Sequence, residues 1–200
     1  KNTPSAHSGT LLRRILWQVF SLSKCARNAH CDVLFVPGGS YFGSFSPVVS
    51  MSQNLLPFDF VEIKRSGISL FTLKMLALRM FQSFTFRRSD GVIFLTDYAR
   101  SVVIKVTGHL RGMTCVIGHG VSKHFYLKPK TQKLIKDYSV TNPFQVIYVS
   151  TVDAYKHQLN VIKAMEILRG RGYAVRLTMI GSAARSSLHL VKKALQLQAS

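Results

Sequence analysis

Six short apolar runs divide the chain, and each ends in a glycine or a polar residue. The runs are Cys31 to Gly39, Pro47 to Gln53, Gly91 to Thr96, Cys115 to Gly120, Gln145 to Thr151 and Arg176 to Ser182. Runs of this length bounded by turn residues are typical of buried strands. We therefore expect six strands, with their polar carboxyl ends in the place where α/β sheets bind ligands.

Helical patterns separate several of these runs. Apolar residues share one helix face at Leu70, Leu73, Ala77, Met80, Phe81 and Phe84, and another at Ala99, Val102, Val103 and Val106. Thr96 and Asp97 suit the start of the second helix, and Gly108 suits its end. Apolar strands that alternate with helices predict an α/β fold with a parallel sheet covered on both faces.

This alternation breaks between residues 125 and 143, where two prolines and four lysines replace the apolar pattern. We read this stretch as a connection with at most a short helix. The expected organisation is a first Rossmann-like domain over 1–124, a connection over 125–144 and the start of a second such domain over 145–200. We expect both ends to be truncated, since the helical pattern of Ser187 to Gln198 stops with the chain.

The composition fits a globular protein that attracts anions. Hydrophobic residues make up 47% of the 200 residues and charged residues 18%, which excludes the usual signature of disorder. Lys and Arg number 27 against 8 Asp and Glu, for a formal net charge of +19. The candidate partners are therefore nucleic acids, anionic membranes and phosphorylated substrates.

Cysteine spacing and hydropathy narrow the protein class further. Cys25, Cys31 and Cys115 form neither a C-x-x-C pair nor a zinc-ligand pattern, so we expect no metal site and no disulfide framework. Charged residues interrupt the longest apolar stretch before it reaches the roughly 18 to 20 residues of a membrane span. We expect a cytoplasmic protein, either free or peripheral on the cytoplasmic face of a membrane.

Several ordered motifs resemble one enzyme family. The strings SDGVIFLTDYAR, CVIGHGVSKHF, VIYVSTVDAYKHQLNVIKAMEILRGRG and LTMIG, between Cys31 and Gly181, are similar to those of the retaining glycosyltransferases of family 4. The resemblance implies a GT-B fold of two Rossmann-like domains, the second truncated here. It also implies transfer of a sugar from a nucleotide-diphosphate sugar to a lipid-linked or saccharide acceptor, in cell-envelope or polysaccharide biosynthesis, without metal or another cofactor.

The resemblance assigns donor-binding residues after the fifth and sixth runs. Lys156 matches the family lysine that binds the diphosphate, and a cation at a helix start suits a diphosphate on physical grounds as well. Ser150 and Thr151 stand near the place of a Gly-Arg pair in many members. Their hydroxyl groups either bind the diphosphate or only cap the following turn. Gly181 matches a family glycine near the nucleotide, although a turn alone also explains it.

The acceptor-side residues come from the first two runs. Gln53 and Asn54 occupy the place of a His-containing family dipeptide, so we expect them to face the acceptor or the sugar. Gly39, in PGGSYFG, either lets a ligand approach the backbone or belongs to a flexible loop. The family's two-glutamate motif would follow after the chain ends. No catalytic residue is therefore assigned, and the fragment itself is expected to be inactive.

Two further hypotheses address the basic charge. The alternative function is a basic module that binds nucleic acid or another polyanion without catalysis. We expect no nucleic-acid partner, however, because the sequence shows no recognisable element for contacting bases, such as a recognition helix or exposed aromatic residues on a sheet.

A second apolar stripe, Phe71, Met75 and Leu78, lies beside Lys74, Arg79 and Gln82 on the first helix. This stripe faces either an anionic membrane surface or another part of the protein.

Overall fold

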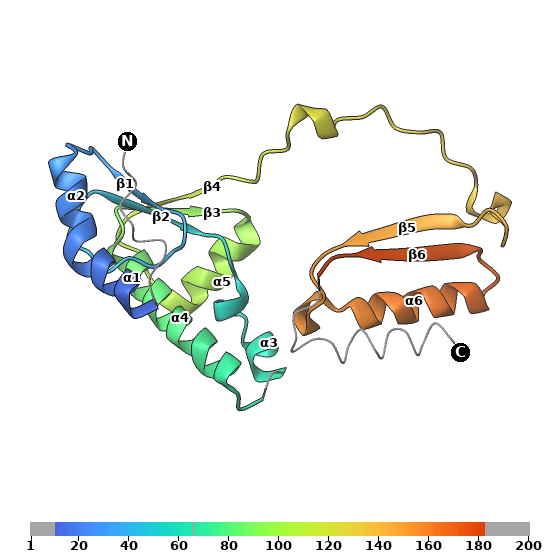
Figure 1. The fold of residues 1–200 in the computed structure, drawn as a ribbon, viewed down its shortest axis with the longest axis horizontal. Coiled ribbons are helices and arrows are strands. Elements are labelled where there is room, and N and C mark those ends of the chain that lie inside the picture. The colour runs from blue at the N-terminus through green and yellow to red at the C-terminus, as the bar shows by residue number, and fades with distance from the viewer. Residues whose placement is uncertain (1–10, 66, 183–200) are drawn as a thin grey trace. The chain divides into compact units, whose positions relative to one another are not determined.

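The protein folds into two compact α/β units, each with a parallel sheet. The computed structural model describes residues 11–65 and 67–182, and the units are Lys1–Lys123 and His124–Ser200. Unit 1 has a four-stranded sheet in the order β1-β2-β3-β4, and unit 2 has a two-stranded sheet of β5 and β6. All neighbouring strands are parallel, which confirms the predicted α/β fold (Figure 1).

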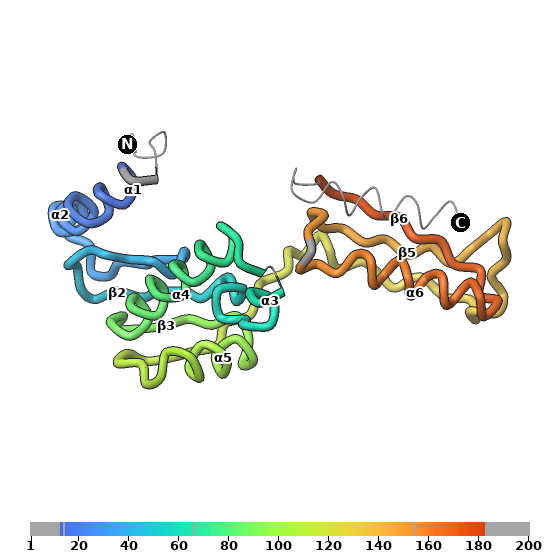
Figure 2. Tube along the Cα trace, turned by 90° about the horizontal axis from the view of Figure 1, so that it is seen from below, coloured from blue at the N-terminus to red at the C-terminus, as the bar shows by residue number. Residues whose placement is uncertain are grey.

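The elements of unit 1 follow one another closely along the chain. They are α1 (Leu11–Trp17), the π-helical η2 (Gln18–Leu22), α2 (Ser23–Asn28), β1 (Leu34–Val36), β2 (Val48–Ser52), η3 (Leu56–Phe58), α3 (Phe60–Arg65), α4 (Leu70–Arg88), β3 (Gly91–Phe94), α5 (Asp97–Thr107) and β4 (Met113–Val116). Figures 1 and 2 show α4 and α5 running side by side along the sheet. The sequence patterns predicted neither the helices before β1 nor α3.

Unit 2 contains fewer described elements. The predicted connection carries two short 3-10 helices, η4 (Lys123–Phe125) at the unit boundary and η5 (Ile135–Asp137). After it come β5 (Phe144–Val149), η6 (Ala154–Lys156), α6 (Gln158–Gly170) and β6 (Val175–Ile180). Ile147 and Val149 of β5 are exposed, so the described residues cover one face of this sheet and not the expected two. The helix predicted over Ser187 to Gln198 lies outside the described residues.

A cluster of aromatic and branched side chains holds the helices of unit 1 on the sheet. Its buried members are Phe58, Phe86, Val92, Phe94, Val103 and Leu110. The ring of Phe86 lies between those of Phe58 and Phe94, with centroid distances of 6.1 and 6.5 Å. The predicted caps of α5 are confirmed: Thr96 accepts a hydrogen bond from the Ala99 N–H at 3.0 Å, and Gly108 ends the helix with φ of 73°.

The buried face of α4 differs from the predicted one. The expected core face is largely exposed, with 86% of Leu70, 65% of Leu73 and 61% of Met80 accessible. The buried residues of α4 are instead Met75, Gln82, Ser83, Thr85 and Phe86. The prediction of the core face is therefore wrong. Met75 of the second apolar stripe is buried, which favours the alternative in which that stripe faces another part of the protein.

Hydrogen bonds to the loop after β1 and to β2 explain this rotation of α4. The hydroxyl oxygen of Thr85 accepts from the Tyr41 N–H at 2.9 Å, and Ser89 donates to the hydroxyl of Ser50 at 2.9 Å. Gln82 donates through Nε2 to the Gly38 carbonyl at 3.4 Å. Since a buried polar group without a partner costs free energy, the polar side of the helix turns inward where these partners are available.

We predict that Thr85→Val lowers the free energy of unfolding by about 1 to 3 kcal/mol, because it keeps the side-chain shape but leaves the buried Tyr41 N–H without an acceptor. Urea unfolding followed by circular dichroism measures the change. Thr114→Val is the matched control, since the β4 side chain of Thr114 is only partly buried and makes no side-chain hydrogen bond in the described structure. Equal effects of the two substitutions would contradict the role of Thr85.

Candidate functional site

The carboxyl ends of β5 and β6 meet closely in unit 2. The Ser150 N–H donates to the Ile180 carbonyl at 2.9 Å, and the Val152 N–H donates to the Ser182 carbonyl at 2.9 Å. A Cβ atom at Gly181 would overlap the Ser150 carbonyl oxygen, so only glycine fits there. This contact brings the predicted donor-binding residues Ser150 and Gly181 together.

Lys156 lies in the short turn that joins this edge to α6. Its N–H donates to the Asp153 carbonyl at 3.0 Å, and its carbonyl accepts from the Tyr148 hydroxyl at 2.9 Å. The backbone of Lys156 is therefore fixed from both sides, while the side chain is exposed. Its Nζ atom lies 5.0 Å from the centroid of the Tyr155 ring and is in no salt bridge with the described residues. Lys156 stands two residues before α6, not at its first position as the sequence indicated.

The start of α6 lacks a side-chain cap. His157, the N-cap residue, has a left-handed backbone with φ of 55°, and its side chain accepts no capping hydrogen bond. The first N–H groups of a helix have no partners inside the helix, so an uncapped start can bind an anion. Gln158 holds the preceding turn in place, because it is buried and donates to the Thr151 carbonyl at 2.8 Å.

The hydroxyl group of Ser150 takes part in the turn itself. It donates to the Thr151 carbonyl at 2.8 Å, which favours the capping interpretation of Ser150. Thr151 is exposed, and its hydroxyl group makes no hydrogen bond with the described residues. Of the two predicted hydroxyl groups, the one on Thr151 is thus the more accessible to a ligand.

The predicted acceptor-side residues lie at the carboxyl edge of unit 1. Gln53 and Asn54 follow β2 and are exposed, and the side-chain oxygen of Asn54 accepts from the Leu56 N–H at 3.0 Å. Gly39 has φ of 67°, and a Cβ atom there would lie 3.1 Å from the Phe86 ring and 3.2 Å from the Met51 carbonyl oxygen. Close packing against the protein explains this glycine without a ligand.

Sequence analysis named Arg79 and Gln82 only beside an apolar stripe of this helix, and it did not place them in a site at this edge. Arg79 and Gln82 sit on the inner side of α4, and each has a buried side-chain atom, Nη1 of Arg79 and Oε1 of Gln82, without a hydrogen-bond partner. Both residues are polar interruptions of an apolar helix, three residues apart. That spacing is the signal that could have indicated a shared face.

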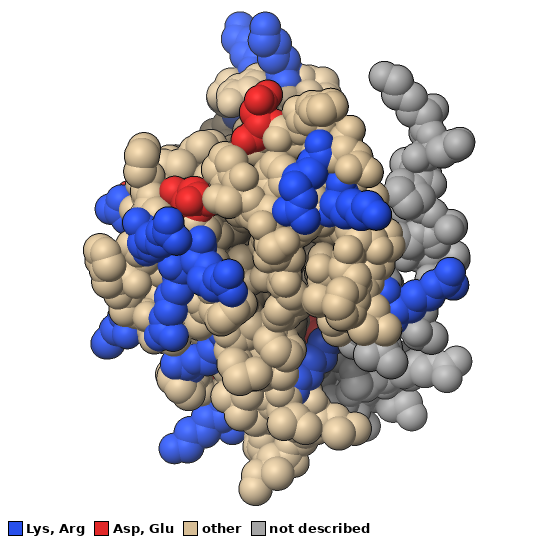
Figure 3. Space-filling model, turned by 90° about the vertical axis from the view of Figure 1, so that its left-hand side faces the viewer, with Lys and Arg blue, Asp and Glu red and all other residues tan. Residues whose placement is uncertain are grey.

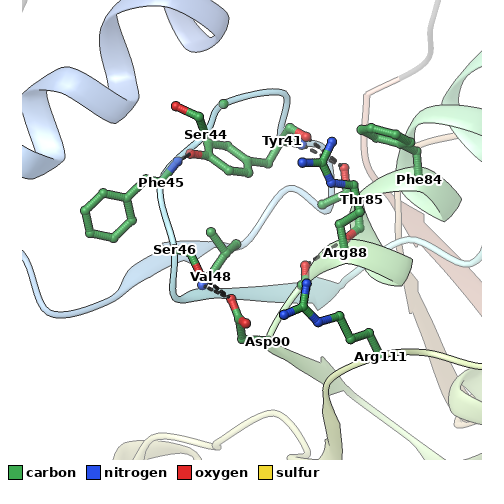
Figure 4. Close-up of a pocket in the computed structure, with 12 residues that line it drawn as sticks. Tyr41, Ser44, Phe45, Ser46, Val48, Phe84, Thr85, Arg88, Asp90 and Arg111 are labelled. Carbon is green, nitrogen blue, oxygen red and sulfur yellow. Dashed lines mark hydrogen bonds between the residues drawn. The ribbon is translucent and has the colours of Figure 1, made fainter.

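A cavity of about 200 Å³ opens at the opposite, amino edge of the unit 1 sheet. Figure 4 shows the side chains of Arg88 and Arg111 extending along one side of it and Asp90 at the start of the strands.

Figure 3, which views the side of the molecule at the left of Figure 1, shows many basic and few acidic side chains. The excess of positive charge is therefore visible on this face.

Asp90 uses its carboxylate to hold the strands at this amino edge. The carboxylate accepts from the Val48 N–H at 2.8 Å and from the Ser46 hydroxyl at 3.0 Å (Figure 4). The Val48 hydrogen bond, followed by that of Ser46 and the charge of Arg111, lowers the pKa of Asp90 against the opposing effect of desolvation. The Asp90 backbone also bonds to both neighbouring strands, so the role of this residue is structural.

We predict that Asp90→Ala destabilises the protein by about 1 to 3 kcal/mol at neutral pH, through loss of the charged hydrogen bonds to Val48 and Ser46. The lowered pKa lies below the unfolded value of about 3.9, so this stabilisation is present above that pH and is lost as the pH falls through the folded pKa. Urea unfolding at a series of pH values should show the gap between wild type and variant closing below about pH 4. Asp32→Ala, at an exposed position, serves as the control.

The described residues contain no group of three or more His, Cys, Asp or Glu side chains that could hold a metal ion. Within residues 11–65 and 67–182, every helix is too short or too polar to cross a bilayer.

Comparison of the chain with protein-family models and with curated proteins finds no match. A function for this chain therefore has to be argued from the two carboxyl edges and from the resemblance of its motifs.

Proposed function

We propose that the chain is part of a GT-B glycosyltransferase that moves a sugar from a nucleotide-diphosphate sugar to a lipid-linked or saccharide acceptor. The two parallel-sheet units support this proposal at the level of architecture. Proteins of many different functions contain such sheets, so the main support for the proposal comes from the residues at the carboxyl edge of unit 2. In this proposal, unit 2 binds the donor through its carboxyl edge and unit 1 binds the acceptor through its own.

The observation that carries the proposal is the position of Lys156. Its backbone is held on both sides and its side chain has no ion-pair partner among the described residues, immediately before an uncapped helix. A diphosphate gains from both features, since the ammonium group supplies a full charge and a helix start carries a partial positive charge. The exposed hydroxyl group of Thr151 adds a neutral hydrogen bond, and Gly181 allows the ends of β5 and β6 to approach closely at Ser150.

The chemical role of this arrangement is to stabilise the leaving group. When the sugar departs, negative charge builds up on the diphosphate, and a cation already in place stabilises the transition state more than the ground state. No step requires a metal ion in this scheme. The amide groups of Gln53 and Asn54 on unit 1 are suited to bind sugar hydroxyl groups but not to remove a proton.

The outward face of α4 supports a membrane-bound acceptor. Leu70, Leu73 and Met80 expose most of their side chains next to the exposed Lys74, in a protein with a net charge of +19. Apolar side chains that insert into a bilayer beside basic groups bind best to anionic membranes. We therefore propose that the protein works at the cytoplasmic face of a membrane and that nucleic acid is not its partner.

We predict that Lys156→Ala lowers the rate of sugar transfer about 100-fold or more in an active form of the protein, because a charged contact to the leaving diphosphate is lost. In the chain itself, the same substitution should weaken binding of nucleoside diphosphates about tenfold, as measured by calorimetry over a panel of UDP, GDP and ADP. Lys163→Ala, an exposed lysine on α6, is the matched control. Undiminished binding and transfer in Lys156→Ala would remove this residue from the mechanism.

We predict that the double substitution Leu70→Ser and Met80→Ser reduces binding to anionic vesicles about tenfold or more, because each lost side chain removes exposed apolar area that would enter the bilayer. Flotation with vesicles of phosphatidylcholine and phosphatidylglycerol measures the bound fraction, which should also fall as salt is added. Tyr98→Ser on α5 is the control, since its side chain is also exposed. If wild type fails to float, the membrane part of the proposal is wrong.

A further inference from the structure

Two buried polar atoms of α4 face the inside of unit 1 without a partner. Nη1 of Arg79 and Oε1 of Gln82 are shielded from solvent and make no hydrogen bond. Gln82 as a whole is only 8% exposed. Buried donors and acceptors are almost always paired in native proteins, so two unpaired groups three residues apart on one helix call for an explanation.

Among the described residues, no acidic side chain forms a salt bridge with Arg79. The salt bridges in the described part of the chain join Arg65 to Glu62 and Arg100 to Asp97, and neither includes Arg79. Its guanidinium group instead lies over the Phe60 ring, 3.7 Å from the centroid. Desolvation by burial lowers the pKa of Arg79, and no acidic side chain within residues 11–65 and 67–182 opposes this effect. The protein therefore maintains a partly desolvated cation at a cost in stability.

The two side chains lie at the carboxyl edge of the unit 1 sheet. Gln82 donates to the carbonyl of Gly38, which follows β1. Because α4 ends just before β3 begins, its C-terminus is at the amino edge of the sheet and its N-terminus points to the carboxyl edge. Arg79 is about 4.5 Å further toward the N-terminus of α4 than Gln82, and so lies beyond the strand ends, where ligands of parallel sheets bind.

We propose that Arg79 and Gln82 form a binding site for an oxyanion, a phosphate or a carboxylate, that carries a neighbouring hydroxyl group. The guanidinium group donates to the oxyanion, and Oε1 of Gln82 accepts from the hydroxyl. Both unpaired atoms then have partners, and the anion neutralises the partly desolvated charge of Arg79. The Phe60 ring holds the guanidinium plane in place before the ligand arrives.

The site defines the class of acceptor, and in this respect it rests on the proposed function. An acceptor that fits would be a saccharide bearing a phosphate or an acidic sugar, with the oxyanion held by Arg79. Donor binding belongs to unit 2 and does not involve these residues. The site in unit 1 can therefore be tested without a donor and without sugar transfer.

The first test is thermal unfolding of the 200-residue chain with inorganic phosphate or acetate, each compared with sodium chloride at equal ionic strength. When the concentration of the anion is roughly ten times its dissociation constant, an anion that binds should raise the melting temperature of unit 1 by about 5 °C. A response to phosphate alone assigns a phosphate-bearing ligand, and a response to acetate alone assigns a carboxylate. If neither anion acts beyond sodium chloride, the proposal is overturned.

Substitutions separate binding from a structural role. Arg79→Met should abolish the anion response and leave the anion-free protein as stable as wild type or more so, because a partly desolvated charge without an ion-pair partner among the described residues is removed. Arg88→Met is the matched control, since Arg88 lies on the same helix with its guanidinium 5.0 Å from the Phe84 ring, and it should keep the response. A destabilised Arg79→Met protein that still responds to the anion would show that Arg79 only supports the fold.

Chemical labelling tests the wild type directly, whether or not the variant folds. Phenylglyoxal modifies accessible arginine side chains, and mass spectrometry of the digested protein reports each site. The bound anion should slow modification of Arg79 severalfold and leave Arg88 unchanged, whereas equal rates at Arg79 with and without the anion would overturn the site. Anion binding by the chain, with no Lys156-dependent transfer in an active form of the protein, would contradict only the proposed function. Lys156-dependent transfer without anion binding at Arg79 would contradict only this inference.

Discussion

The rotation of α4 about its own axis determines what unit 1 can bind. Three polar contacts, from Gln82, Thr85 and Ser89 to the segments around β1 and β2, turn the polar side of this helix toward the sheet. A different rotation would expose Phe86 and break the aromatic cluster beneath the helix. The same rotation brings Arg79 inward. Hydrogen bonding and aromatic packing thus act together to shield one guanidinium nitrogen of Arg79 from solvent.

The two edges of the unit 1 sheet differ in whether their polar side chains have hydrogen-bond partners. At the amino edge, the carboxylate and backbone of Asp90 are paired with the neighbouring strands. At the carboxyl edge, Arg79 and Gln82 keep unpaired atoms. A fully paired edge stabilises the fold, whereas unpaired groups reduce stability and are retained where a ligand supplies the missing partner. Lys156 in unit 2 is similar in one respect: its backbone is fixed by hydrogen bonds, while its exposed side chain forms no salt bridge with the described residues.

Local signals in the sequence predicted the strands, the caps at Thr96 and Gly108 and the α/β class, because each depends on neighbouring residues. The buried face of α4 could not be predicted in this way. Apolar residues surround that helix, so periodicity alone does not choose a face, and the choice depends on partners such as Tyr41, about forty positions away along the chain. The inward position of Arg79 was missed for the same reason. The packing role of Gly39 likewise depends on Phe86, a distant residue.

The inward and outward sides of α4 differ in how well they tolerate substitutions. Each inward polar residue shares its bond with a distant segment, so a change there requires a matching change elsewhere. Outward residues such as Leu70 and Met80 touch little of the fold, and their replacement leaves the folding free energy nearly constant. Relatives of this protein could therefore adapt the outer surface of α4 to new surroundings one residue at a time, while the inner surface changes only in coordinated pairs.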